Sequence, residues 1–167
     1  MLNQIAQLTE TIEAYDEDVQ KLAATKYSDL APLRTVYGVG PLTALTFVLT
    51  LGDKHRFAVS RDVGCYLGLR PRRSQSGEYD PQLPITKAGD RYLRTLLVEV
   101  AHLVLGPRGP DTALRRWGRK LAERGGKNAK KRAIIAVARK LAILLHRLWV
   151  TQEAYRPFPY AYKAAAC

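Results

Sequence analysis

The sequence has only two cysteines among its 167 residues, Cys65 and Cys167. They form neither a disulfide framework nor a Cys-x-x-Cys metal pattern, which indicates a reducing compartment. Every apolar run is interrupted well short of the ~20 residues that a membrane span needs. Met1 is not followed by the basic stretch and apolar core of a secretory signal. We therefore expect a cytoplasmic protein without a membrane segment.

Clustered metal ligands are also lacking. His55, His102 and His146 are scattered, and the last two lie on apolar helix faces, as core or boundary histidines do. Acidic residues number 15 against 27 Lys and Arg, and they are spread over different predicted elements. Without a carboxylate cluster, we expect this chain to bind no metal by itself.

Positive charge is what the sequence has in excess, with a net charge of +12 at pH 7. Six acidic and two basic residues leave residues 1–30 at −4, so residues 31–167 carry +16. Lys and Arg that neutralise phosphates release condensed counterions, which makes nucleic acid the expected partner. A merely soluble or ribosome-like basic protein is the simpler alternative. Because 47% of the residues are hydrophobic, the chain can build a core and is not a disordered polycation.

Residues 1–27 predict a coiled-coil helix. Apolar residues recur at alternating spacings of three and four along a seam formed by Ile5, Leu8, Ile12, Tyr15, Val19 and Leu22. A helix of fewer than four heptads is only marginally stable alone, so we expect the chain to form a homo-oligomer through the residue 5–22 seam. An amphipathic helix lying on its own domain is the alternative.

The remaining periodicity predicts an all-α, mainly helical domain over residues 28–155, with at most a small β-hairpin near 70–85. The tail, residues 156–167, is expected to be loosely ordered. Helices are expected from Pro41 to before Gly52, from Ser60 to Gly68, from Lys87 to Leu105, from an Asp111 cap to Glu123, and over 128–150.

Residues 30–52 fit a helix-hairpin-helix, in which Gly38, Val39 and Gly40 are followed by Ala44. Glycines let a backbone approach closely, and the next helix N-terminus aims its amides at a phosphate. Such a contact fixes position on a duplex without reading sequence. A tight turn with no ligand is the alternative.

The segment from Arg70 to Gly77 places three arginines around two serines, Ser74 and Ser76. Guanidiniums suit phosphoryl chemistry because they stabilise charge on the equatorial oxygens. A nucleophilic serine also needs an activating base, and no histidine or acid at an obvious spacing supplies one. The segment taken alone therefore fits a solvated basic loop as well.

Further basic residues recur on the later helices. Lys87, Arg91 and Arg94, spaced by four and three, predict a phosphate-gripping stripe on one helix. Eleven basic residues and one acidic residue lie between Arg115 and Lys140. The Lys127–Arg132 run opposes the helix dipole, so stability alone would not select it, whereas Arg139 and Lys140 need only be solvated. The DNA-binding side chains expected on these segments are Lys87, Arg94, Arg115, Arg116, Arg119, Lys127, Lys130, Lys131 and Arg132.

In this order the motifs resemble the C-terminal transposase domain of the Piv/MooV-type insertion-sequence transposases, over about residues 28–155. They run Gly-Val-Gly-Pro from Gly38, Leu-Gly-Asp from Leu51, Tyr-Leu-Gly-Leu-Arg-Pro from Tyr66, Gln-Ser-Gly from Gln75, and Ile-Thr-Lys-x-Gly-Asp-x-x-Leu-Arg from Ile85. The resemblance implies a serine recombinase acting in DNA transposition. Ser76, with Ser74 as the alternative, would attack a DNA phosphodiester, and Arg72, Arg73 and Arg91 would hold the phosphate.

The resemblance also implies parts that we do not find in this sequence. Complete members have an N-terminal RuvC-like domain with four acidic ligands, expected to hold Mg²⁺, ahead of a coiled coil. Some members are directed to transposon-end and target DNA by a structured bridge RNA, and they assemble as tetramers. We therefore expect a nucleoid-associated transposase half that is inactive alone and needs the acidic domain in trans. The alternatives are a noncatalytic nucleic-acid-binding or dimerisation module, and last an RNA chaperone-like protein.

Overall fold

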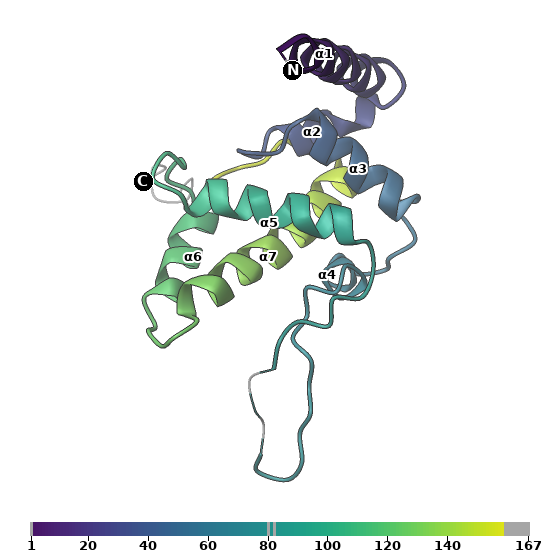
Figure 1. Ribbon diagram of the computed structural model, residues 1–167. Coiled ribbons are helices and arrows are strands. Elements are labelled where there is room, and N and C mark those ends of the chain that lie inside the picture. The colour runs from purple at the N-terminus through teal and green to yellow at the C-terminus, as the bar shows by residue number, and fades with distance from the viewer. Residues whose placement is uncertain (1, 80, 82, 159–167) are drawn as a thin grey trace, which may run out of the picture.

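The computed structural model describes residues 2–79, 81 and 83–158 (Figure 1). Over these residues the chain contains helices, two isolated β-bridges and no strand, which confirms the all-α prediction. None of the described helices is long and apolar enough to cross a membrane. The elements are α1 (Leu2–Thr25), the 3-10 turn η1 (Ser28–Leu30), α2 (Ala31–Arg34), α3 (Pro41–Leu51), α4 (Arg61–Tyr66), α5 (Arg91–Leu105), α6 (Ala113–Ala122) and α7 (Ala129–Thr151).

Helix α7 is the centre of the core and packs against α2, α4, α5 and α6. Its apolar residues recur every three or four positions, so that Val137, Leu141, Leu145 and Leu148 form one buried stripe. Leu97 of α5 is fully buried in the same cluster. The helices around α7 therefore cover a single hydrophobic core.

Helix α1 stands at one end of this body (Figure 1). Its C-terminal part packs on α3 and η1, where Ala23 is buried and Val19 is half-buried. The rest of the predicted seam is exposed, with Ile12 at 59% and Tyr15 at 67% of their surface. The helix that we predicted over residues 1–27 is confirmed as a helix, and its apolar stripe largely faces solvent in this chain.

Two predicted helix starts are wrong. Helix α5 begins at Arg91, because the carboxylate of Asp90 accepts a hydrogen bond from the Leu93 amide at 2.6 Å and caps the helix. Lys87 lies in the preceding loop with φ +58°, so it does not share a helical stripe with Arg91. At α6 the cap is the Thr112 hydroxyl, which accepts from the Arg115 amide at 3.1 Å, rather than Asp111.

The chain after α7 runs back over the body as far as it is described. The Tyr155 amide donates to the Thr35 hydroxyl at 2.8 Å. The Pro157 carbonyl accepts from the Ala113 amide at 3.0 Å. The tail that we expected to be loosely ordered, residues 156–167, lies outside the described residues from 159 onward.

A buried polar contact joins α7 to the loop before α4. His146 is 1% exposed, and its Nε2 donates to the Lys54 carbonyl at 3.0 Å. Because the carbonyl can only accept, Nδ1 is left to accept from the Ser60 hydroxyl at 2.9 Å. Ser60 therefore binds His146 instead of capping α4, where its side chain makes no cap hydrogen bond. Burial lowers the pKa of His146, against the smaller raising effect of the Lys54 carbonyl.

We expect this histidine to make the fold sensitive to acid. Its pKa is lowered in the folded state, so below about pH 6.5 the unfolded chain binds more protons and stability falls as the pH falls. One such group contributes a slope of at most about 1.4 kcal/mol per pH unit. Urea denaturation between pH 5 and pH 8 should show a steeper loss for the wild type than for His146→Gln. Parallel curves for the two proteins would contradict the assignment.

Candidate nucleic-acid interface

The described residues within 69–90, which are 69–79, 81 and 83–90, form a long arm that projects from the body between α4 and α5 (Figure 1). At its base, the Thr86 amide donates to the Arg70 carbonyl at 2.9 Å. The Arg72 amide donates to the Pro84 carbonyl, also at 2.9 Å. This part corresponds to the small hairpin expected near residues 70–85, although only isolated bridges form among the described residues.

A tight turn makes the tip of the arm. Ser76 and Tyr79 exchange both backbone hydrogen bonds, at 3.0 and 3.1 Å. Between them Gly77 has φ +57° and Glu78 does not have a positive φ, which is the pattern of a type II′ turn. Ser76 and Ser74 are both exposed. The arm thus presents Ser76 at its far end, with solvent around it.

The three arginines expected to hold the attacked phosphate lie further back. Arg72 and Arg73 precede Ser76 by four and three residues, which corresponds to roughly 10–13 Å of extended chain. The Arg73 guanidinium donates to the Gln75 side chain. Arg91 is exposed at the start of α5, beside the base of the arm. The three arginines thus lie on the arm or at its base, at a distance from the Ser76 hydroxyl. A nucleic acid that contacts both the arginines and this hydroxyl would have to extend along the arm.

Close backbone contact holds the base of the arm on the body. Gly68 has φ +68°, and a Cβ there would lie inside 3.0 Å of the Ala88 backbone. The Arg94 guanidinium donates to the Leu67 carbonyl at 3.1 Å and to the Ala88 carbonyl at 2.8 Å. We selected Arg94 from the sequence as a DNA contact, but its guanidinium donates hydrogen bonds within the chain and so joins the two ends of the arm.

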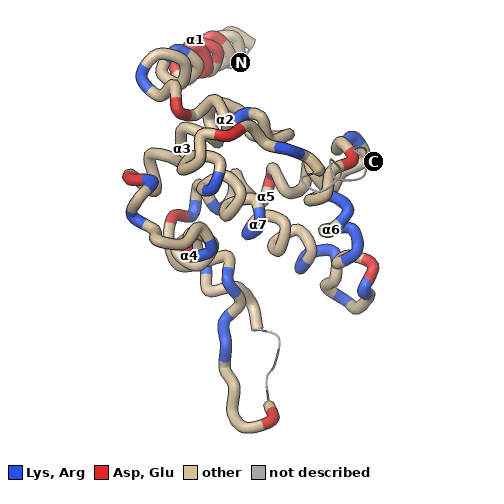
Figure 2. Tube along the Cα trace, turned by 180° about the vertical axis from the view of Figure 1, so that it is seen from behind, with Lys and Arg blue, Asp and Glu red and all other residues tan. Residues whose placement is uncertain are grey.

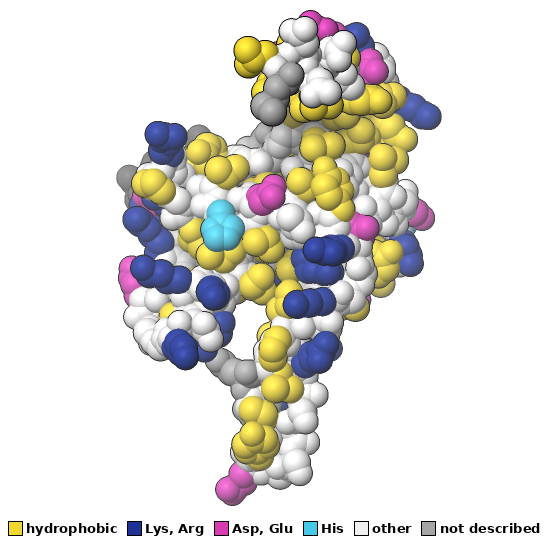
Figure 3. All heavy atoms as spheres, in the orientation of Figure 1, with side chains coloured by type: hydrophobic (Ala, Val, Ile, Leu, Met, Phe, Trp, Pro, Cys, Tyr) yellow, Lys and Arg dark blue, Asp and Glu magenta, His cyan; other side chains and the backbone are white. Residues whose placement is uncertain are grey.

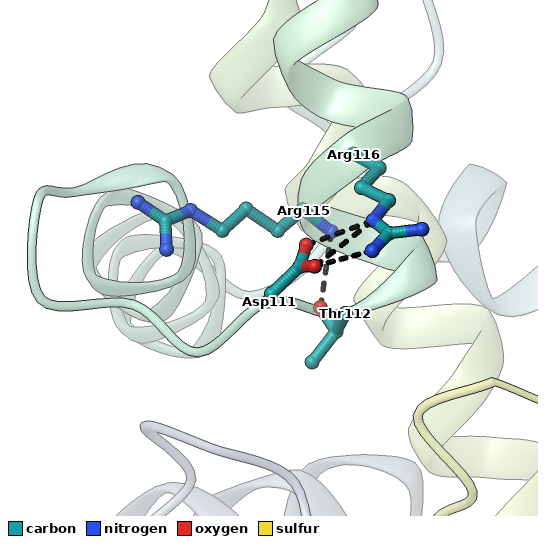
Figure 4. A network of polar contacts seen from close by, with 4 residues as sticks. All are labelled: Asp111, Thr112, Arg115 and Arg116. Atoms are coloured by element: carbon teal, nitrogen blue, oxygen red, sulfur yellow. Dashed lines mark hydrogen bonds and ion pairs between the residues drawn. The ribbon is translucent and has the colours of Figure 1, made fainter.

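Two other selected arginines are also engaged within the chain. The Arg115 guanidinium donates to the Gly106 carbonyl at 2.7 Å. Arg116 binds Asp111 through both carboxylate oxygens, with its Nε 2.9 Å from Oδ1 (Figure 4). This hydrogen bond holds the pKa of Asp111 below its usual value and raises the pKa of Arg116. Asp111 therefore forms an ion pair with Arg116 and does not have the capping role that we predicted.

The selected cations that remain exposed lie on the arm and its base, on α6 and at the start of α7. Figure 2 shows Lys and Arg on the arm, α6 and α7, and several acidic residues on α1. Lys127, Lys131 and Arg132 are exposed at or near the N-terminus of α7. Arg119 and Lys130 line a smaller hollow of about 450 Å³ between α5, α6 and α7. Lys87 is exposed in the loop before α5.

A groove of about 810 Å³ separates the arm from one face of α7. Figure 3 shows this opening with basic side chains on both sides. Its cationic lining is Arg70, Arg72, Arg73, Lys131, Arg132 and Arg139. Its apolar lining is Pro71, Pro81, Leu83, Pro84, Ile85, Ile135 and Ala136. Six Lys and Arg side chains share this lining, so the groove is suited to a polyanion.

Two of these groove cations, Arg70 and Arg139, were not selected from the sequence as binding residues. Arg139 was expected only to be solvated, but it is half-buried, and its Nε is buried without a hydrogen-bond partner among the described residues. Its spacing of seven residues from Arg132 places both on one helix face. That spacing could have identified Arg139 from the sequence. The opposite wall of the groove could not be identified in this way, because the arm is distant from α7 in sequence.

The Gly38–Gly40 turn lies at the opposite end of the body from the arm, in both ribbon and tube views (Figures 1 and 2). Gly40 is extended and directly precedes Pro41, the first residue of α3. Val39 is 5% exposed and packs in the core, so a ligand at this turn would meet Gly38 and Gly40. The predicted binding residues thus fall into two separate places.

Metal ligands are not gathered in the described part of the chain, where no group of three or more His, Cys, Asp or Glu side chains could hold an ion. The fold and this surface define a small, strongly basic, all-α domain with a projecting serine-tipped arm. The sequence over residues 30–116 matches the family described as "Transposase IS116/IS110/IS902 family", and the chain belongs to this family.

Named relatives agree with that family. The transposase for insertion sequence element IS1111A from Coxiella burnetii is 36% identical over 148 residues, 88% of this chain and 40% of that protein. The transposase for insertion sequence element IS1328 from Yersinia enterocolitica is 38% identical over 73 residues, 44% of this chain and 22% of that protein. The pilin gene-inverting protein of Moraxella lacunata is 33% identical over 127 residues, 75% of this chain and 37% of that protein. This chain therefore spans less than half the length of each relative.

Proposed function

We propose that this chain is the DNA-binding, serine-bearing part of an insertion-sequence transposase, and that Ser76 attacks a DNA phosphodiester. The observation that carries the proposal is the exposed Ser76 at the tip of an arm whose base borders a cationic groove. Such a groove attracts the phosphate backbone without reading its sequence. The family membership and the named transposases support the same assignment.

The proposed step is an in-line displacement at phosphorus. The Ser76 Oγ forms a bond to phosphorus while the bond from phosphorus to one deoxyribose oxygen breaks, and the serine proton ends on that leaving oxygen. The products are a phosphoserine ester and a free DNA hydroxyl, so the phosphoester bond is conserved for rejoining. Ser76 is placed by the II′ turn, and the arginines along the arm would bind the flanking phosphates.

The described residues do not fit a catalytic metal, because they bring together no suitable group of ligands. We therefore propose that Mg²⁺, if the complete enzyme uses it, is held by an acidic domain supplied in trans. A structured guide RNA is a further proposed partner, since its phosphates would suit the same cations.

A covalent adduct tests the proposal. The purified chain is incubated with labelled transposon-end DNA and Mg²⁺, with and without a separately expressed acidic domain of a related transposase, and then denatured. We expect protein-linked label that requires the acidic domain, disappears in Ser76→Ala and persists in Ser74→Ala, which lies on the same arm. An adduct that survives Ser76→Ala and disappears in Ser74→Ala would move the nucleophile to Ser74.

A second candidate function is a noncatalytic nucleic-acid-binding and dimerisation module. The exposed apolar seam of α1 favours it, because that stripe is unpartnered in the single chain. DNA binding without an adduct under every combination would favour this second function. In either case we propose that the seam makes a homo-oligomer.

A further inference from the structure

The groove between the arm and α7 combines a cationic and an apolar surface, and binding of a duplex would use only the cationic one. Six cations line it, and apart from Asn128 its other described lining residues are apolar, among them Ile135 and Ala136 on α7 and Leu83 and Ile85 on the arm. We infer that this groove holds an unpaired polynucleotide strand, with its bases on the apolar side chains and its phosphates on the arginines. The inference deepens the proposed function and rests on it.

Base exposure distinguishes the two kinds of ligand. In B-form DNA the base faces are stacked inside, so a binding protein meets phosphates, sugars and base edges. Apolar side chains recessed in a groove would have little to contact there. In an unpaired strand the base faces are free and can stack on apolar side chains and guanidinium planes, while the backbone follows the cations.

Arg139 is the groove cation whose position is fixed most clearly by its neighbours. Gly64 of α4 gives it room, because a Cβ on Gly64 would lie 2.8 Å from the Arg139 Cγ. The stem and the Nε, which would lie 3.3 Å from that Cβ, are therefore packed against α4, and Arg139 is also among the residues that line the groove. Its buried Nε has no hydrogen-bond partner among the described residues.

The position of the groove also fits the arm. Arg72 and Arg73 line the groove and lead, along the same chain segment, to Ser76 at the tip. A strand that lies in the groove would continue toward that hydroxyl. The nucleotides beside the attacked phosphate would thus be unpaired when the serine reaches them.

Binding of three matched probes tests the inference: a 15-nucleotide oligo(dT), a 15-nucleotide oligo(rU) and a 15-base-pair DNA duplex, each measured with the full chain by fluorescence anisotropy. We expect Arg139→Gln to weaken single-strand binding by about tenfold or more, with duplex binding changed less than about threefold. The salt dependence of single-strand binding should fall by about 0.7 in slope for each phosphate that the variant no longer neutralises. The control is Arg147→Gln, the same change on an exposed part of α7 that does not line the groove.

Two further variants allow the inference to be tested even if Arg139→Gln disturbs the fold. Arg132→Gln changes an exposed groove residue and should weaken single-strand binding more than duplex binding. Ile135→Thr leaves the charge unchanged but adds a hydroxyl to the apolar wall, and it should weaken the single strand while leaving the duplex unchanged.

Equal losses for single strand and duplex in the groove variants would overturn the inference and leave only a general phosphate surface. No loss in any of them would overturn it as well. Selective loss on either oligo(dT) or oligo(rU) would support it, and the stronger of the two identifies the strand as DNA or RNA. Because the assay needs no cleavage, a failed Ser76 adduct would remove the proposed chemistry while leaving this result in place.

Discussion

Replacing Gly68 by alanine is expected to lower the free energy of unfolding by about 4 kcal/mol and to detach the base of the arm. The added Cβ would lie inside 3.0 Å of the Ala88 carbonyl oxygen and amide nitrogen, and φ at this position is +68°. Neither neighbour is a side chain that could rotate away, and Arg94 already ties the Ala88 carbonyl to Leu67. Urea denaturation followed by far-ultraviolet circular dichroism measures the loss.

Gly77→Ala is the matched control, because Gly77 has a similar φ of +57° but no atom within 4 Å of a built Cβ. Its expected cost is about 1 kcal/mol, for the left-handed backbone alone. The difference between the two variants isolates the contact with Ala88. Similar losses at both positions would show that this contact does not hold the arm. If the arm places Ser76, Gly68→Ala should also lose the covalent adduct.

Replacing Ile12 by glutamate is expected to turn an oligomer of this chain into a monomer. Ile12 is 59% exposed in the single chain and lies in the middle of the seam with Ile5, Leu8 and Tyr15. In a paired seam the introduced carboxylate would be buried beside an apolar residue or beside its own copy, which costs several kcal/mol or forces dissociation. Sedimentation equilibrium at several concentrations measures the association.

Gln7→Glu provides the comparison, since it adds a similar charge to α1 at a position outside the seam. It should leave the association constant nearly unchanged. A wild-type chain that is monomeric at all concentrations, or an Ile12→Glu chain that still associates, would show that the seam packs on something other than a second copy.

Local sequence signals were sufficient for the helices and for the family. The α7 stripe, the Pro41 start and the long N-terminal helix follow from apolar spacing and capping residues, which depend on neighbours a few positions away. The order of motifs from Gly38 to Arg94 likewise indicated an insertion-sequence transposase, and the match over residues 30–116 shows that family. The start of α5 was misplaced because apolar spacing alone did not reveal that Asp90, rather than Lys87, marks the helix boundary.

The roles of individual cations were decided only by the tertiary structure. Arg94, Arg115 and Arg116 look like free basic residues in sequence, yet each finds an acceptor within the folded chain. Arg139 looks merely solvated, yet it lines the groove, because α4 and the arm approach α7 from far away in sequence. Charge and periodicity are properties of the chain and can be counted along it. Which charge remains available to a ligand depends on the backbone carbonyls and carboxylates that packing brings near it, and that proximity exists only once the chain has folded.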